Sequence, residues 1–134
     1  MHLFFENHTP SIARPALYIS ICMKSELDVP IFTQSNVITG DNFPAELPET
    51  GSFMCRLQNL PLPESSFRLS YDLSSSPVGG VILDSLDGAA ELHVEGGDFF
   101  GSGQLPNIHQ GVALVGGRWE MCPAEKPLMM PALA

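Results

Sequence analysis

Basic residues are scarce in this sequence. Six lysines and arginines stand against fifteen aspartates and glutamates, which gives a formal net charge of −9. The arginines are also scattered, at Arg14, Arg56, Arg68 and Arg118. Nucleic acids and anionic membranes are bound by clustered lysine and arginine. The sequence therefore predicts neither of them as a partner, and the acidity favours solubility.

Cysteine is also rare, and its three copies, Cys22, Cys55 and Cys122, are odd in number and show no CxxC spacing. This argues against a disulfide framework and against a zinc site. Cys22 and Cys55 stand in alternating apolar runs, where a free thiol packs as a small hydrophobic group. Free thiols are typical of a reducing compartment. The sequence also lacks a membrane-spanning apolar run and a secretion signal. Because a strand pattern begins close to Met1, we expect a fragment of a longer chain.

The short motifs of the common enzyme classes are missing, since the chain contains no GxSxG, no HExxH and no P-loop. The four histidines show no ligand-pair spacing, and the start of the chain, with His2 and His8, is expected to be frayed. The glycine-rich segment GGDFFGSG opens no helix, which excludes a dinucleotide-binding loop. Its Phe99 and Phe100 are expected to anchor the loop to the core.

Two features leave a catalytic alternative open. Asp84 and Asp87 lie near each other, although aspartates beside serine and glycine are usually turn formers. Cys55 would need an activated thiolate to act as a nucleophile, and its inward-facing position disfavours this. The sequence thus predicts a domain that is not an enzyme and that uses no metal and no cofactor. A small hydrolase that uses Asp84 or Asp87 is the weakest of the alternatives.

Glycine and proline, with twelve copies each, fall between short runs of alternating polarity, as they do between strands. The predicted strands cover residues 17–24, 31–37, 53–58, 67–73, 89–94, and 112–121 with a bulge at Gly116–Gly117. Residues 81–88 are predicted as a short edge strand or a turn. Many short strands without a helical pattern indicate one all-β domain. We expect an immunoglobulin-like antiparallel β-sandwich over residues 1–122 and a flexible tail over residues 123–134.

Two aromatic residues carry structural alternatives. Tyr71 follows a proline-rich turn, where a tyrosine can form a corner hydrogen bond of the immunoglobulin type, or can simply pack with a wet hydroxyl. Trp119 is the sole tryptophan. It is expected to fill the sandwich or cover a sheet edge, or else to stack on a sugar ring through its apolar face.

One predicted strand face is polar along its length. In residues 67–73, Arg68, Ser70 and Asp72 alternate with apolar neighbours, and Glu91 and His93 occupy the same position in the next strand. Such planar donors and acceptors can satisfy paired sugar hydroxyls. The candidate carbohydrate-binding set is Gln34, Arg68, Ser70, Asp72, Glu91 and His93. The alternatives are a hydrated outer face, and a rival patch of Tyr18, Ser20, Arg56 and Gln58 expected on the other sheet.

Several short motifs follow one another in a specific order: Gly51, the Leu60-Pro61-Leu62 turn, the strand Phe67–Leu73, Asp84 or Asp87, the run Ala89–Val94, the DFFGSG loop, Gly111–Val112 and Trp119. This order resembles the C-terminal domain of the ATP-binding subunit of Wzt-type O-antigen polysaccharide ABC exporters. The resemblance covers about residues 17–121, and it departs from the family pattern at Ser65–Ser66, where a glycine usually precedes the aromatic residue.

This resemblance implies a cytoplasmic module, peripheral to the inner membrane through its transporter. The module would recognise the non-reducing end of a finished O-antigen polysaccharide and so select it for export. Its partners would be its own upstream ATPase domain, the transmembrane exporter subunit and a second copy of itself, with exchange of a terminal strand as a route to the homodimer. The alternative function is a protein-interaction sandwich that does not bind sugar.

Overall fold

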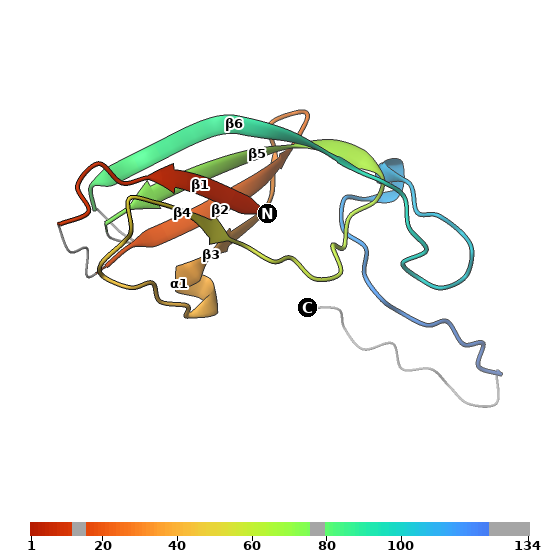
Figure 1. Ribbon diagram of the computed structural model, residues 1–134. Helices are drawn as coiled ribbons and strands as arrows, with labels where there is room; N and C mark the ends of the chain where they lie inside the picture. Colours follow the sequence, from red (N-terminus) through yellow and green to blue (C-terminus); the bar gives the residue numbers. More distant parts are fainter. Residues whose placement is uncertain (12–15, 76–79, 124–134) are drawn as a thin grey trace.

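The protein is a sandwich of two antiparallel sheets, as the sequence predicts (Figure 1). The computed structural model describes residues 1–11, 16–75 and 80–123. The larger sheet has the order β3-β2-β5-β6, and the smaller one pairs β1 with β4. The strands are β1 His2–Glu6, β2 Tyr18–Ser25, β3 Pro30–Ser35, β4 Thr50–Met54, β5 Ser65–Ser74 and β6 Ile82–Val94; α1 spans Asn36–Thr39 and the 3₁₀ turn η1 spans Ile108–Gln110.

The centre of the large sheet follows from period-two alternation. In the antiparallel pair β2–β5, Ile21 lies opposite Tyr71 and Met23 opposite Leu69. Directly opposed residues share one face of a sheet, so the apolar sets of both strands point to the same side. There they form the core cluster of Ile21, Met23, Leu62, Phe67 and Leu69. Met23 and Phe67 are each only 1% exposed, which marks this pair of strands as the centre of the fold.

The small sheet covers this apolar face. Leu3 of β1 packs against the core cluster, and Phe53 of β4 is buried. The Phe5 and Phe53 rings lie 4.9 Å apart between centroids. Gly51 leaves room for this packing, because a Cβ atom there would lie 2.8 Å from Cζ of Phe5. The glycine expected just before a strand is therefore a position of close approach inside β4.

A helical turn ends the edge strand β3 earlier than the alternation predicts. Ser35 caps α1 by accepting a hydrogen bond from the Ile38 N–H, and Gly40 ends α1 in the left-handed region at φ 76°. The Asn36 side chain accepts from the Ile19 N–H and donates to the Leu17 carbonyl. These bonds fasten α1 to the start of β2.

Strand β6 is a single long edge strand that contains a bulge. Leu69 pairs with Ala90 and Tyr71 with Leu86, so Ser70 alone lies opposite the segment 87–89. Gly88 sits in this segment at φ 64°, a conformation that glycine adopts without the penalty of a Cβ atom. The segment 81–88, predicted as a short strand or turn, is thus joined to the segment 89–94 through the bulge.

Several expectations for the ends of the chain are wrong. The start is not frayed, since His2 lies in β1. Residues 112–121 form no strand, and Trp119 is fully exposed at 102% of its reference area instead of filling the sandwich. Phe99 and Phe100 pack edge to face on each other and remain exposed. Of the predicted tail, residues 124–134 lie outside the described part.

No helix in the described ranges has the length and apolarity that crossing a bilayer requires.

Tyr71 does not make the corner hydrogen bond. Its hydroxyl donates to Oδ2 of Asp84 at 2.9 Å across the β5–β6 pair, and this bond raises the pKa of Tyr71 above 10.0. The partner is thus a carboxylate on the neighbouring strand instead of a backbone group a few residues upstream. The sandwich architecture stands without this immunoglobulin hallmark.

Candidate functional site

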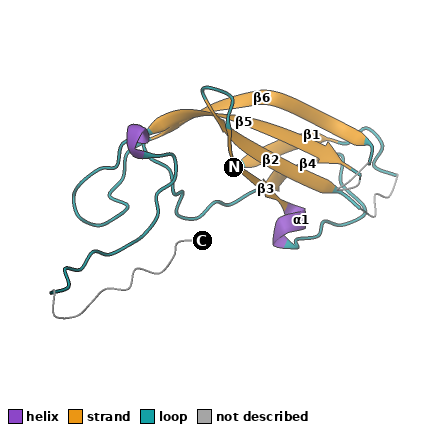
Figure 2. Cartoon of the chain, turned by 180° about the vertical axis from the view of Figure 1, so that it is seen from behind, coloured by secondary structure: helices purple, strands orange, loops and turns teal. Residues whose placement is uncertain are grey.

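The large sheet has a second face, turned away from the core, which we call the polar face. Cross-strand pairs place Ser20 opposite Asp72, Lys24 opposite Arg68, Arg68 opposite Glu91, and Ser66 opposite His93. Because opposed residues share a face, these side chains form one surface over β2, β5 and β6. Figure 2 shows these strands side by side, with the segment after β6 extending beyond one end of the sheet.

All but one of the predicted sugar-binding residues lie on the polar face. The exception is Gln34, which pairs with Ile21 and therefore points to the core side. The physical reason is register, since Ser35 pairs with Ser20 and Thr33 with Cys22. Strand β3 does lie in the predicted sheet, but its alternation is one residue out of step with the expectation.

The predicted rival patch is divided by the structure. Tyr18 and Ser20 lie on the polar face itself, in β2, beside the residues with which they were expected to compete. Arg56 follows β4 and lines the cavity between the sheets, while Gln58 is exposed in the connection to β5. The two sets of polar side chains on β2 and β5 therefore make one continuous surface.

Ser70 is occupied by the β6 bulge. Its hydroxyl donates to Oδ1 of Asp87 and accepts from the Gly88 N–H at 3.1 Å. Lys24 Nζ lies 3.1 Å from the same Asp87 oxygen and 3.8 Å from Asp28. The hydrogen bond from Ser70, followed by that from Lys24, lowers the pKa of Asp87 below 3.8, and the bond to Asp87 raises the pKa of Lys24. This cluster holds the bulge and leaves Ser70 little capacity for a ligand.

The structure does not bring Asp84 and Asp87 together as a carboxylate pair. Asp84 lies opposite Leu73 and bonds to Tyr71, both of which belong to the core-facing set. Asp87 bonds to Ser70 and Lys24 on the polar face. The two carboxylates therefore serve opposite sides of the sheet, and the geometry offers no shared site for acid–base chemistry.

At one end of the polar face, a cluster surrounds His93. The Nδ1 atom of His93 lies 3.3 Å from the Ser66 hydroxyl, and its Nε2 atom lies 3.9 Å from Glu64. Both His93 and Glu64 have more than half of their side-chain area exposed. Arg68 and Glu91 follow on the same face. These groups can exchange hydrogen bonds with a solvent-borne ligand, but they lie on an open strand surface.

The other end of the polar face is hollowed into a depression of about 210 Å³. It combines an aromatic ring, a carboxylate and several hydroxyls, contributed by the ends of β2, β3 and β5. The Asp72 carboxylate and the Tyr18 and Ser20 hydroxyls form no hydrogen bond or ion pair within the described part of the chain. The lining residues are Tyr18, Ile19, Ser20, Ser35, Val37, Asp72 and Ser74.

Sequence reasoning missed this depression because it needs the pairing of two strands. Tyr18 lies opposite Ser74 and Ser20 opposite Asp72, and alternation within either strand cannot reveal that register. The signal in the sequence was present only as two separate polar sets, each on its own strand. Their combination gives the depression its mixture of apolar and hydrogen-bonding groups.

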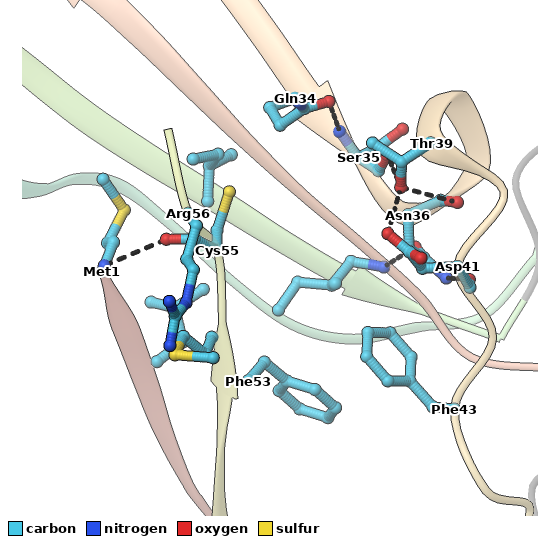
Figure 3. A pocket seen from close by; sticks show the side chains of 14 residues that line it. Met1, Gln34, Ser35, Asn36, Thr39, Asp41, Phe43, Phe53, Cys55 and Arg56 are labelled. Carbon is cyan, nitrogen blue, oxygen red and sulfur yellow. Dashed lines mark hydrogen bonds between the residues drawn. The ribbon is translucent and has the colours of Figure 1, made fainter. Parts of the chain in front are cut away.

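A second cavity, of about 240 Å³, lies between the two sheets (Figure 3). Its walls include the apolar side chains of Leu3, Ile21 and Phe53, together with Cys55 and Arg56. On the α1 side, the polar groups bond to one another, as in the Thr39 hydroxyl that donates to Asp41 at 2.7 Å. This cavity is therefore less suited to a hydroxyl-rich ligand than the polar face is.

No group of three metal-ligating side chains occurs within residues 1–11, 16–75 and 80–123. No protein-family model matches the chain, and no curated protein sequence matches it either. The chain's likeness to the O-antigen exporters therefore rests on its sequence motifs alone.

Proposed function

We propose that this domain is a non-catalytic carbohydrate-binding module whose site is the depression on the polar face. The observation that carries the proposal is the convergence of Tyr18, Ser20 and Asp72 on one hollow of about 210 Å³. By comparison, a cavity of about 150 Å³ holds a benzene molecule, so a hollow of this size has space for one six-membered sugar ring.

The chemistry of the depression fits a sugar. A tyrosine ring packs on the apolar C–H face of a pyranose while its hydroxyl finds a polar partner. A carboxylate accepts hydrogen bonds from two neighbouring hydroxyls, and hydrogen bonds to a charged acceptor are the stronger kind. Because each hydroxyl gives up a bond to water, the net gain is only about 0.5–1.5 kcal/mol per neutral bond. Binding of a single sugar ring is therefore weak, and specificity comes from the combination of contacts.

The sequence resemblance supplies the biological role in this proposal. The domain recognises the non-reducing end of an O-antigen polysaccharide and so selects the finished chain for ABC-transporter export. It acts on the cytoplasmic side of the inner membrane, joined to its own ATPase domain and docked on the exporter subunit. In support, two of the resembling segments coincide with strands of the large sheet, since Phe67–Leu73 lies in β5 and Ala89–Val94 lies in β6.

The test is a titration of the purified chain with cognate and unrelated O-polysaccharides, followed by NMR. We expect shifts at Tyr18, Ser20 and Asp72 with the cognate glycan. Asp72→Ala should lower the affinity several-fold without unfolding the domain, and Arg68→Ala should have a smaller effect because Arg68 lies outside the depression. Glu26→Ala, an exposed carboxylate beyond the far end of β2, is the matched control. Absence of binding to every glycan, or shifts that avoid the polar face, would count against the proposal.

A protein-interaction sandwich is the second candidate, and a specific observation favours it. No strand in the described part of the chain pairs with the outer edge of β6, where Ile82 and Leu83 are exposed, and Trp119 and Met121 are exposed beyond it. An unpaired edge with apolar side chains can accept a strand from a partner. We propose a second copy of this chain as that partner, in the homodimer that a two-subunit transporter requires. Association through the β6 edge, together with indifference to every sugar, would favour the second candidate over the first.

A further inference from the structure

We propose that the depression selects a terminal sugar ring that carries no negative charge, and that Asp72 is the residue that sets this preference. The inference rests on the proposed carbohydrate function and specifies its substrate class. It separates neutral and aminated sugars, which the site accepts, from uronic acids and from phosphorylated or sulfated sugars, which it rejects.

The first observation is the charge of the lining. Among the lining residues in the described ranges 1–11, 16–75 and 80–123, Asp72 is the only charged side chain, and none is a lysine, arginine or histidine. The Asp72 side chain is exposed, and its carboxylate is without a hydrogen-bond or ion-pair partner among the residues that the structure describes. Both carboxylate oxygens are therefore free to accept hydrogen bonds from a ligand.

The second observation is where the cations of the polar face lie. Lys24 forms ion pairs with Asp87 and Asp28, which compensate its charge. Arg68 is four residues from Asp72 along β5, a separation of about 13 Å in an extended strand. Arg68 also lies directly opposite Glu91. A sugar ring seated in the depression therefore finds no described cation within hydrogen-bonding distance.

The charge of the lining separates neutral or aminated sugar rings from anionic ones. Two neighbouring hydroxyls, or an ammonium group, donate hydrogen bonds to the free carboxylate. A carboxylate or phosphate substituent at the same place loses its hydration and meets a like charge, and none of the described lining residues is a cation that could compensate it. The net charge of −9 adds a long-range repulsion of the same sign. The neutral and the aminated ring thus fit where the anionic ring does not.

The experiment compares oligosaccharides that share one backbone and differ only in the terminal ring. The terminal ring is a hexose, the corresponding hexosamine or the corresponding uronic acid, each in gluco, galacto and manno configuration. NMR titration of the whole chain gives both the affinity and the site. We expect at least a tenfold preference for the neutral or aminated ending over the uronic acid of the same configuration, with shifts at Tyr18 and Ser74.

Asp72→Asn is the decisive variant, because an amide keeps the shape and removes the charge. It should weaken binding of the neutral ending by about tenfold, as expected for loss of a charged acceptor, and it should bring the neutral-to-uronate ratio close to one. Glu26→Gln removes the same charge six residues beyond Ser20, the partner of Asp72, or roughly 20 Å away in an extended strand, and should leave both affinities unchanged.

Four results would overturn the inference. Uronate-ended glycans that bind as tightly as neutral ones, or shifts confined to the Arg68–His93 end, would refute the charge selection while leaving carbohydrate binding in place. An unchanged ratio in Asp72→Asn would refute the role of Asp72. If no oligosaccharide in the set binds, the proposed carbohydrate function itself fails, and the inference fails with it.

Discussion

Ser70 has a structural role, although it lies on the polar face, where other side chains are free to bind a ligand. It is the buried polar side chain of the β5–β6 pair, and it satisfies both the Gly88 N–H and the Asp87 carboxylate. Ser20, one strand away, has a hydroxyl without a partner in the described ranges. The two serines look alike in the sequence, because both alternate with apolar residues, and only their neighbours separate their roles.

We expect Ser70→Ala to lower the free energy of unfolding by about 1 kcal/mol, the usual net value of a lost hydrogen bond, with more if the Gly88 N–H stays unpaired. Ser20→Ala makes the same chemical change on the same face and should be close to neutral. Urea unfolding of both variants measures the difference. Equal destabilisation by the two substitutions would show that Ser70 does not hold the bulge.

The contribution of the Asp87 carboxylate to stability can be tested by measuring the free energy of unfolding at acidic pH. Its hydrogen bonds to Ser70 and Lys24 lower its pKa below 3.8 in the folded state, so the folded protein binds this proton less readily than the unfolded chain does. The stabilisation is therefore present above pH 3.8 and is lost as the pH falls through the folded value. Asp87→Asn should remove this part of the profile in urea unfolding measured across the acid range. If the wild type and Asp87→Asn differ by a constant amount at every pH, the carboxylate's ion pairing has no role in stability.

At the scale of elements, alternation predicted the features that depend on the sequence of one strand alone. The faces of β2 and β5 are correct because each strand carries its own period-two pattern. Gln34 was misassigned because the face of β3 depends on its register against β2. The β6 bulge and the strand β1 were missed for a related reason, since both depend on contacts with a neighbour. The segment 112–121 has strand propensity but no paired strand in the described structure, and propensity alone does not make a strand.

The site divides in the same way. Arg68, Asp72, Glu91 and His93 could be assigned to one polar face from sequence spacing. The depression could not be predicted, because Tyr18 and Asp72 converge only through the pairing of β2 with β5. A candidate patch can thus be read from one strand, whereas a concave site requires the register between strands.

Gly51 tests the contact between β4 and β1. A methyl group at Gly51 would approach the Phe5 ring to 2.8 Å, while one at Gly97 would meet nothing within 4 Å. We expect Gly51→Ala to destabilise the domain by about 1–3 kcal/mol, as overpacking does, and Gly97→Ala to be nearly neutral. Thermal or urea unfolding of the two variants compares them. Equal stabilities would mean that the Phe5 ring moves aside without cost and that the small sheet is loosely packed.

At the scale of the molecule, the sandwich is unequal. The two strands β1 and β4 face a sheet of four, and the apolar side chains of β6 at Ile82 and Leu86 stay exposed. In the segment that follows η1, the Leu114 N–H donates to the Pro61 carbonyl. Residues 115–123 then extend away from the strands (Figure 1). No described strand covers the edge of β6, and residues 115–123 extend from the same chain, so we propose that the two meet between two copies of the protein.

Trp119 makes this meeting measurable, because it is the only tryptophan and it is fully exposed in the single chain. If residues 112–121 pair with a second copy, the Trp119 emission should shift to shorter wavelength as the concentration rises, in step with a doubling of mass by light scattering. Trp119→Ala should weaken the association, because it removes the largest apolar side chain of the segment. Phe4→Ala, which removes another exposed aromatic ring on β1, should leave the association unchanged. A mass that doubles while the indole emission stays that of a water-exposed ring would place the interface elsewhere, and a chain that stays monomeric at every concentration would refute strand exchange.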